Sequence, residues 1–140
     1  MTRGQDTQEI VRVDSKGRVT IPARMREELG LQEGTYAVIR LERNDRNVLV
    51  SLFAGAKARL VEIRLKIPDR PGALARAART LSELNLDLMM SSSRTLKKGD
   101  AAEWVAIADI SQSNKPIEDI KSKIIENRDA NEVEIKELPM

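Results

Sequence analysis

Residues 60–81 read LVEIRLKIPDRPGALARAARTL and join a strand pattern to a helix pattern through a turn. Apolar side chains alternate strictly with charged ones from Val61 to Ile67, which is typical of a strand with one buried face. The Pro- and Gly-containing segment from Asp69 to Gly72 then predicts a turn. The apolar residues that follow recur at helical spacing: Leu74, Ala77, Ala78, Leu81 and Leu84. The stretch therefore predicts a strand, a turn and an amphipathic helix.

The rest of the C-terminal half continues this alternation of element types. Residues 86–96 and 104–110 have strand patterns around a loop at 97–100. A helix capped by Asn114, with Pro116 in its first turn, places Ile117, Ile120 and Ile124 on one face. Residues 132–138 form a last strand pattern. The order βαββαβ predicts an α+β ferredoxin-like sheet with two helices on one face. We expect the other, bare face to pair with a second copy.

The N-terminal half has a different, mostly-β pattern. Residues 10–13 and 18–21 are β-rich and flank a turn signal, which predicts a hairpin. Pro22 opens a short helix from Ala23 to Leu29, and Gly30 ends it. Residues 35–42 and 48–53 are a second strand pair. Small residues at 54–59 interrupt the strand patterns and predict a linker. We therefore expect two domains, 8–53 and 60–138, joined by the linker 54–59. A surface turn within one domain is the alternative to a linker.

The composition excludes several classes of function. The 140 residues include no Cys and no His, which excludes thiol and imidazole catalysis and the metal sites that these residues build. No apolar run of about 18 residues can span a membrane, and the N-terminus is polar. We therefore expect a cytoplasmic protein that is not an enzyme, makes no membrane contact and has neither a cofactor nor a metal site.

The N-terminal domain is too small to bury the apolar residues that it carries. Domains of about 45 residues usually need a disulfide, a metal or a second copy to be stable. Without Cys or His, oligomerisation remains, and we expect a homodimer formed through this domain. Packing of the C-terminal half over the same residues is the alternative.

Positive charge concentrates at the start of the chain. Residues 10–26 contain five basic side chains and one acidic side chain, Asp14, although the whole chain has a net charge of only +2. Such a cluster can bind the phosphates of duplex DNA, because each neutralised phosphate releases counterions. An ordinary solvated surface is the alternative. The candidate DNA-binding residues are Arg12, Lys16, Arg18, Arg24 and Arg26.

The string from Val13 to Pro22, followed by Arg26 and Leu29-Gly30-Leu31, resembles the AbrB-type swapped-hairpin family of DNA-binding transcription regulators. The resemblance covers about residues 8–53. It implies an interlocked dimer in which hairpins of both chains form one sheet, with DNA contacts around the motif. Arg18 matches the motif arginine, and Arg26 falls where the family often has a helix arginine. The same fold also serves in antitoxins.

The segment from Asp69 to Leu74 is the second candidate site. Asp69 can cap the helix, Pro71 fits its first turn, and Gly72 leaves space beside open backbone N–H groups that can accept a carboxylate or phosphate. A turn without a ligand is the alternative. This segment, in a βαββαβ order, resembles an ACT domain over residues 60–138. The resemblance implies side-by-side pairing of sheets and an amino acid or other small effector at the interface. The implied ligand residues are Asp69, Arg70, Pro71, Gly72, Ala73 and Leu74, with residues 90–94 of a partner strand.

These patterns together indicate a ligand-responsive transcriptional regulator. A homodimer would bind duplex DNA through its N-terminal domain, and the ACT-like domain would sense an effector or pair dimers into a tetramer. Two alternatives stay open: an antitoxin-like protein-interaction module and a non-catalytic regulatory subunit of an amino-acid metabolic enzyme.

Overall fold

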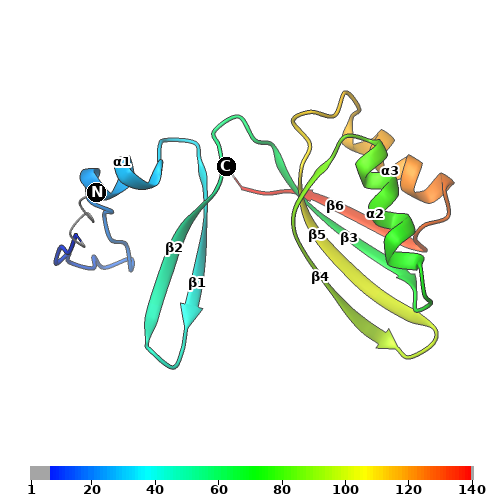
Figure 1. Cartoon of the computed structure of the whole chain (residues 1–140), viewed down its shortest axis with the longest axis horizontal. Helices are drawn as coiled ribbons and strands as arrows, with labels where there is room; N and C mark the ends of the chain where they lie inside the picture. Colours follow the sequence, from blue (N-terminus) through cyan, green and yellow to red (C-terminus); the bar gives the residue numbers. More distant parts are fainter. Residues whose placement is uncertain (1–6, 140) are drawn as a thin grey trace, which may run out of the picture. The chain divides into compact units, whose positions relative to one another are not determined.

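The computed structural model describes residues 7–139 (Figure 1). The chain divides into two compact units, with the boundary between Lys57 and Ala58. We call these the N-terminal unit and the C-terminal unit. No helix among residues 7–139 has the length and the apolar content needed to cross a membrane.

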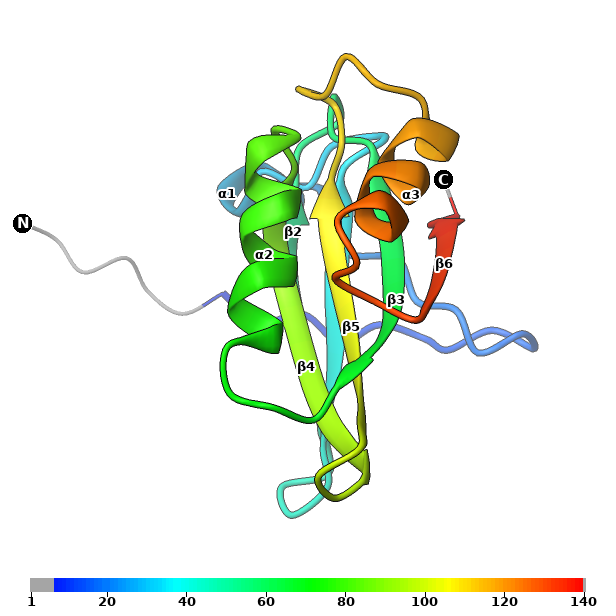
Figure 2. The ribbon, with the colours of Figure 1, turned by 90° about the vertical axis from the view of Figure 1, so that its right-hand side faces the viewer.

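The C-terminal unit is the expected α+β sandwich. Its elements are β3 (Leu60–Pro68), α2 (Ala73–Glu83), β4 (Asp87–Lys97), β5 (Ala101–Asp109), α3 (Ile117–Glu126) and β6 (Glu132–Glu137). The strands form one antiparallel sheet in the order β4-β5-β3-β6. Figure 2 shows α2 and α3 together on one face of this sheet. The predicted βαββαβ order is confirmed.

The core lies between the sheet and the two helices. The apolar residues of β3 are buried, as their alternation predicts, and they pack with Ile120 and Ile124 of α3. Trp104 is only 3% exposed and lies in the same core. Full burial of one aliphatic side chain in this core contributes about 1.5–3 kcal/mol to the free energy of unfolding. Leu74 was expected on the buried face of α2, but it is 40% exposed because it borders a surface cavity, whereas Ala73 in the same turn packs in the core.

The other face of the sheet carries ion pairs. Arg64 contacts Glu62 at 3.2 Å and Glu103 at 3.0 Å, and Arg94 also contacts Glu103, at 3.2 Å. The hydrogen bond that Arg64 donates to Glu103, and then the negative charge of Glu103, raise the pKa of Arg64. Pairing of this face with a second copy stays a prediction, and it would require these charges to lose water.

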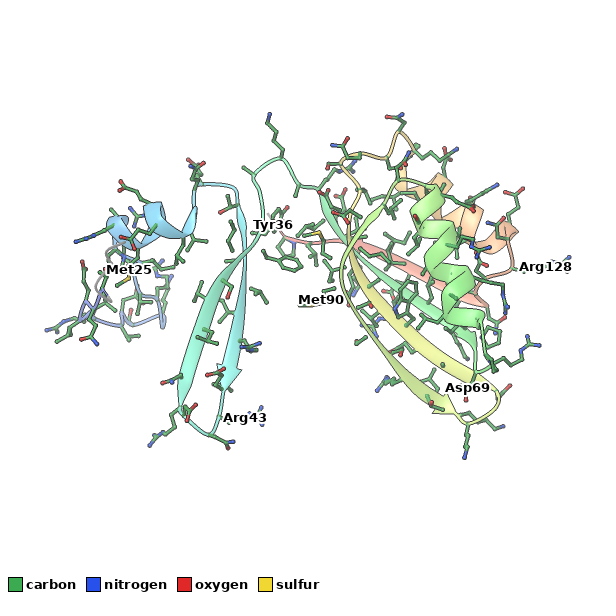
Figure 3. The ribbon with its side chains drawn as sticks, in the orientation of Figure 1. Met25, Tyr36, Arg43, Asp69, Met90 and Arg128 are labelled. Carbon is green, nitrogen blue, oxygen red and sulfur yellow. The ribbon has the colours of Figure 1, made fainter. Side chains whose placement is uncertain are left out.

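The N-terminal unit consists of α1 (Ala23–Leu29) and an antiparallel hairpin of β1 (Tyr36–Glu42) and β2 (Asn47–Ala54). The predicted helix and its end at Gly30 are confirmed. Figure 3 shows Arg43 at the tip of the hairpin. Among the described residues of this unit, only Ala54 is buried, and α1 buries none of its side chains.

The strands predicted at residues 10–13 and 18–21 are wrong for the single chain. The turn between them forms, since Asp14 N–H donates to the carbonyl of Arg18 at 3.0 Å, but neither flank belongs to a strand. A strand needs a neighbour that pairs with its backbone groups, and in the described part of one chain nothing fills that place.

One buried polar contact fixes the connection between α3 and β6. The hydroxyl of Thr80 on α2 donates to Oδ2 of Asp129, and both side chains are buried. Asn127 Nδ2 donates to the same hydroxyl oxygen at 3.2 Å. Two buried polar groups therefore satisfy one another, and the exposed Asn127 adds a third bond from the surface.

Thr80→Val should destabilise the C-terminal unit by about 1–3 kcal/mol, because it leaves the buried Asp129 carboxylate without its donor. Urea unfolding followed by fluorescence of Trp104, the single tryptophan, measures this loss. Ser122→Ala removes an exposed hydroxyl that donates to the Glu118 carbonyl and is the matched control. Equal unfolding midpoints for the two variants would contradict the assignment.

Candidate functional site

The turn at residues 14–18 is held by one carboxylate. Asp14 Oδ1 accepts from the backbone N–H groups of Lys16 at 2.8 Å and Arg18 at 2.9 Å, and Oδ2 accepts from the Arg18 side chain at 2.7 Å. These bonds lower the pKa of Asp14, with the backbone bond from Arg18 contributing most. Because the lowered pKa lies below the ordinary value, the turn is fully held at neutral pH and loosens only in acid.

Two of the other predicted DNA-binding cations also have partners within their own segment. Arg24 lies 3.6 Å from Glu28, one helical turn away on α1. Arg26 donates to the backbone carbonyl of Ile21, which ties the start of α1 to the extended segment before it. Among residues 7–139, no ion pair or side-chain hydrogen bond holds Arg12 or the ammonium of Lys16. The cluster therefore contains both oriented and unpaired cations.

The segment from Asp69 to Leu74 borders a cavity in the C-terminal unit. Figure 3 labels Asp69 in this segment. The cavity has a volume of about 230 Å³. Four of the six predicted ligand residues line it, namely Asp69, Arg70, Ala73 and Leu74, together with Ser93, Arg94 and Thr95 of β4. Pro71 and Gly72 are not among the lining residues. The loop and the end of β4, which lie far apart in the sequence, thus meet at one site.

Asp69 does not cap α2 as predicted. Its Oδ2 accepts from the backbone N–H of Gly99 at 2.7 Å, which ties this loop to the β4–β5 hairpin. Gly72 occupies the N-cap position, and Pro71 precedes the helix instead of entering its first turn. The Asp69 carboxylate thus bonds to the hairpin loop and not to the start of α2.

The first turn of α2 keeps open backbone donors. No side chain among the described residues caps this helix, and its first turn contains no acidic residue. The N–H groups there favour an anion. Asp69 and the hydroxyls of Ser93 and Thr95 border the same cavity. The arrangement offers donors for a carboxylate and acceptors for an ammonium, which suits a zwitterion.

Asn114 does not cap α3, since Pro116 occupies the N-cap position and no side-chain cap bond forms. In the described part of the chain, no group of three or more Asp or Glu side chains could hold a metal ion.

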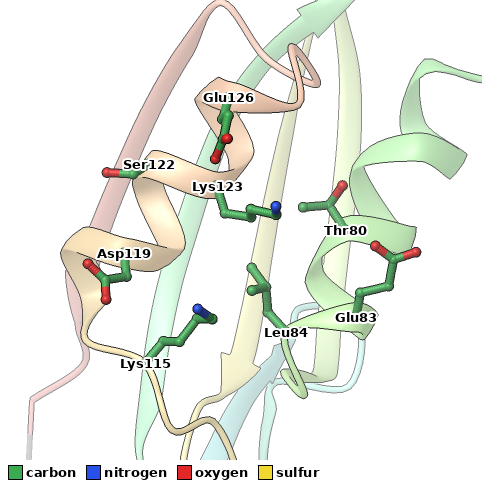
Figure 4. Close-up of a pocket in the computed structure, with 8 residues that line it drawn as sticks. All are labelled: Thr80, Glu83, Leu84, Lys115, Asp119, Ser122, Lys123 and Glu126. Atoms are coloured by element: carbon green, nitrogen blue, oxygen red, sulfur yellow. The ribbon is translucent and has the colours of Figure 1, made fainter.

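A larger hollow of about 460 Å³ lies between α2 and α3, and the sequence did not predict it. Figure 4 shows Lys115 and Lys123 reaching into it from the α3 side, with Thr80 and Leu84 opposite. Its rim mixes these lysines with Glu83, Asp119 and Glu126. No pattern could have indicated it, because two helices from distant segments form its walls. Its mixed, exposed charges select no ligand, so the smaller cavity is the better candidate site.

Comparison with protein families agrees with the geometry of both units. Residues 61–125 match the ACT domain family. This match covers most of the C-terminal unit. Residues 10–50 match the family described as antidote-toxin recognition MazE, bacterial antitoxin. Both matches are to regulatory families, and they cover the two patterns that the sequence distinguishes.

Comparison with curated proteins found no match. Among solved structures, the chain is similar to "GqqA- a novel type of quorum quenching acylases", at 17% identity over 85% of this chain, with a TM-score of 0.44. It spans 63% of that structure's length. It is also similar to a prephenate dehydratase from Streptococcus mutans, at 19% identity over 91% of this chain and 70% of that one, with a TM-score of 0.44. At these scores neither likeness assigns a function.

Gly72→Ala should destabilise the loop at the cavity by about 1–2 kcal/mol, because Gly72 has a φ of +86° and only glycine adopts this region without strain. The added Cβ would also lie 3.2 Å from Arg76 Nη1, although that flexible end can move. Urea unfolding read by Trp104 fluorescence measures the loss. Gly55→Ala, with no atom within 4 Å of the new Cβ and no positive φ, is the control. An unchanged unfolding midpoint in Gly72→Ala would contradict the prediction, because the loop would then have adjusted to the new side chain without cost.

Proposed function

We propose that this chain is a non-enzymatic, ligand-responsive regulator of transcription. A dimer formed through the N-terminal unit binds duplex DNA, and the ACT domain binds a small effector or pairs dimers. The observation that carries the proposal is the uncovered apolar surface of the N-terminal unit, the same unit that contains the basic cluster.

The β1–β2 hairpin has one almost entirely apolar face that is open in the single chain. Ile39 is 70% exposed, and Leu41 and Val48, which are paired across the hairpin, are each 58% exposed. An isolated two-stranded hairpin is marginal in water, and an apolar face of this kind marks an interface. The flanks of the 14–18 turn, which have strand sequences and no strand partner, also need a neighbour. A second copy supplies both requirements at once.

Ile39→Glu should convert the dimer to monomer or unfold the N-terminal unit, because it places a charge in the proposed interface. Ile125→Glu makes the same change at an exposed position on α3, where Ile125 is 51% exposed, and should leave the mass unchanged. Sedimentation velocity of the full chain compares the two. If both variants keep the mass of the wild type, the hairpin face is not the interface.

Dimerisation also explains how a chain with a net charge of only +2 could bind DNA. A two-fold axis brings two copies of the basic cluster onto one assembly and doubles its local charge. The fixed Asp14 turn orients the Arg18 guanidinium, whereas Arg12 and Lys16 are left to reach phosphates. Oriented arginines suit base edges, and unpaired cations suit the DNA backbone.

Arg18→Ala should weaken binding to a preferred duplex by about 1–3 kcal/mol if its guanidinium contacts a base edge. Lys16→Ala should lower the slope of log affinity against log salt by about one. The duplex comes from selection out of a random pool, and fluorescence anisotropy across salt concentrations gives both quantities. Lys98→Ala, in the β4–β5 loop, is the control. Wild-type binding by both test variants would refute the DNA interface.

The ACT domain has features suited to pairing and to effector binding. β4 is an edge strand of 11 residues, and the six residues from Leu88 to Ser93 carry no charge. Long uncharged edges are templates for a second strand. Pairing there would bring residues 90–94 of a partner towards the cavity. The site of about 230 Å³ is small for a complete ligand pocket, and residues of a partner would enclose it further.

An amino acid should bind the wild-type chain, and Asp69→Asn should weaken this binding about tenfold or more, because the ammonium loses its charged acceptor. The amide oxygen of Asn can still accept from Gly99, so the loop is retained. Calorimetric titration with each of the twenty amino acids identifies the ligand. Asp100→Asn, in the adjacent hairpin loop, is the control. Binding of no amino acid would leave pairing as the role of the domain.

The match of residues 10–50 to an antitoxin family favours one second candidate, an antitoxin-like interaction module. Such a dimer would bind and inhibit a toxin protein. A toxin encoded beside this gene and neutralised by the chain would support this candidate. Salt-dependent DNA binding that changes with an amino acid would favour the regulator.

A further inference from the structure

Arg59, the residue before β3, is held on the C-terminal unit by both its backbone and its side chain. Its N–H donates to Asp109 Oδ1 at 3.0 Å, and its carbonyl accepts from the N–H of Ile110 at 2.8 Å. Its guanidinium Nη2 lies 2.6 Å from Glu137 Oε1. One residue therefore joins the start of β3 to the ends of β5 and β6.

The Asp109 carboxylate holds two segments together. Besides Arg59, its Oδ1 accepts from the N–H of Ser111 at 2.9 Å, at the start of the loop to α3. Burial raises the pKa of Asp109, but the hydrogen bonds from Arg59 and Ser111 outweigh it and lower the pKa overall. Asp87 on β4 is the cross-strand neighbour of Asp109 and also carries a carboxylate. The acceptor is thus charged at neutral pH.

The other end of the linker is fixed within the N-terminal unit. Gly34 has a φ of +86°, and a Cβ added to it would lie 3.5 Å from the Cβ of Ala56. Ala56 therefore lies beside the loop before β1. Between Ala56 and Arg59 only Lys57 and Ala58 remain, so two residues separate this contact from the bonds of Arg59.

β3, which begins after Arg59, and β5, which ends at Asp109, both extend to the candidate cavity. β3 begins next to Arg59 and ends at Pro68, which lines the cavity beside Asp69. β5 begins near the cavity, where Ala102 is a lining residue, and ends at Asp109. A strand of nine residues spans about 30 Å. Two adjacent strands, hydrogen-bonded along their length, thus connect the cavity to the linker.

We propose that Arg59, Asp109 and Glu137 form a linker clamp, which confines bending between the units to Lys57 and Ala58 and passes changes in the ACT sheet to the N-terminal unit. The clamp fixes the direction in which the chain leaves the sheet. A shift of β3 against β5 or β6, caused by a ligand or by pairing, moves this exit, whereas a long flexible linker would absorb it. The passing of changes from the ACT sheet to the N-terminal unit rests on the function proposed above, but the clamp itself does not.

Amide hydrogen exchange in the full chain, followed by NMR, tests the clamp without DNA or ligand. The amide of Arg59 should be protected, and those of Lys57 and Ala58 should exchange freely. Asp109→Ala should lower the protection of Arg59 about tenfold or more. Lys136→Ala removes a neighbouring surface ion pair with Glu134 and should leave it unchanged.

Glu137→Gln keeps the shape of the acceptor and is the second variant, should Asp109→Ala unfold the unit. It should weaken protection of Arg59 by a smaller factor. An Arg59 amide that exchanges as fast as that of Ala58 in the wild type would overturn the clamp, whatever the chain binds.

Insertion of Gly-Ser-Gly-Ser between Lys57 and Ala58 tests the transmission. With an equimolar mixture of the twenty amino acids as the probe, the DNA affinity of the wild type should change about fivefold or more. The insertion variant should bind DNA as the wild type does without the mixture, and lose the change. An equal change in both proteins, or none in the wild type, would overturn the transmission. Absence of any DNA binding would instead refute the proposed function, and amide exchange would still decide the clamp.

Discussion

The N-terminal unit has more apolar surface than its own elements cover. In the C-terminal unit, two helices cover one face of a four-stranded sheet and close a core around β3. In the N-terminal unit, a seven-residue helix buries nothing, and the apolar face of the hairpin is open to water. Because hydrophobic burial is the main term that opposes chain entropy, this unit needs a further surface to fold stably. The proposed dimer and the DNA binding by its basic cluster both depend on this requirement.

Short-range bonds orient the groups that would act on DNA and on a ligand. Asp14 organises the turn that carries Arg18, while Asp69 fastens the loop at the cavity to the β4–β5 hairpin. Asp14 accepts from two backbone N–H groups and from the Arg18 side chain. Asp69 accepts from the backbone N–H of Gly99 and leaves the start of α2 without a side-chain cap. The two sites lie in separate units, and β3 with the short linker after Ala56 forms the covalent route between them.

The regular spacing of apolar residues in the C-terminal half was sufficient to predict its ACT-like fold. The alternation in β3, the helix after Gly72 and the strand order all agree with the sequence, because local preference and burial act in the same direction there. The sequence could not decide whether residues 10–13 and 18–21 form strands within one chain, since a strand pattern does not say which chain supplies the pairing partner. Asp69 was misassigned as a cap because the competing donor, Gly99, lies 30 residues away. The hollow between α2 and α3 and the linker clamp likewise depend on contacts between distant segments, which leave no periodic signal.

The most direct test of this account is amide exchange, measured by mass spectrometry on the full chain, across residues 10–21. Within one chain this segment has a turn but no ladder, so its flanks should exchange at the rates of an unstructured peptide if the protein is a monomer. Strand pairing with a second copy predicts strong protection on both flanks of the turn, lost on dilution below the dissociation constant of the dimer. Fast exchange at every concentration would show that no partner completes the N-terminal unit.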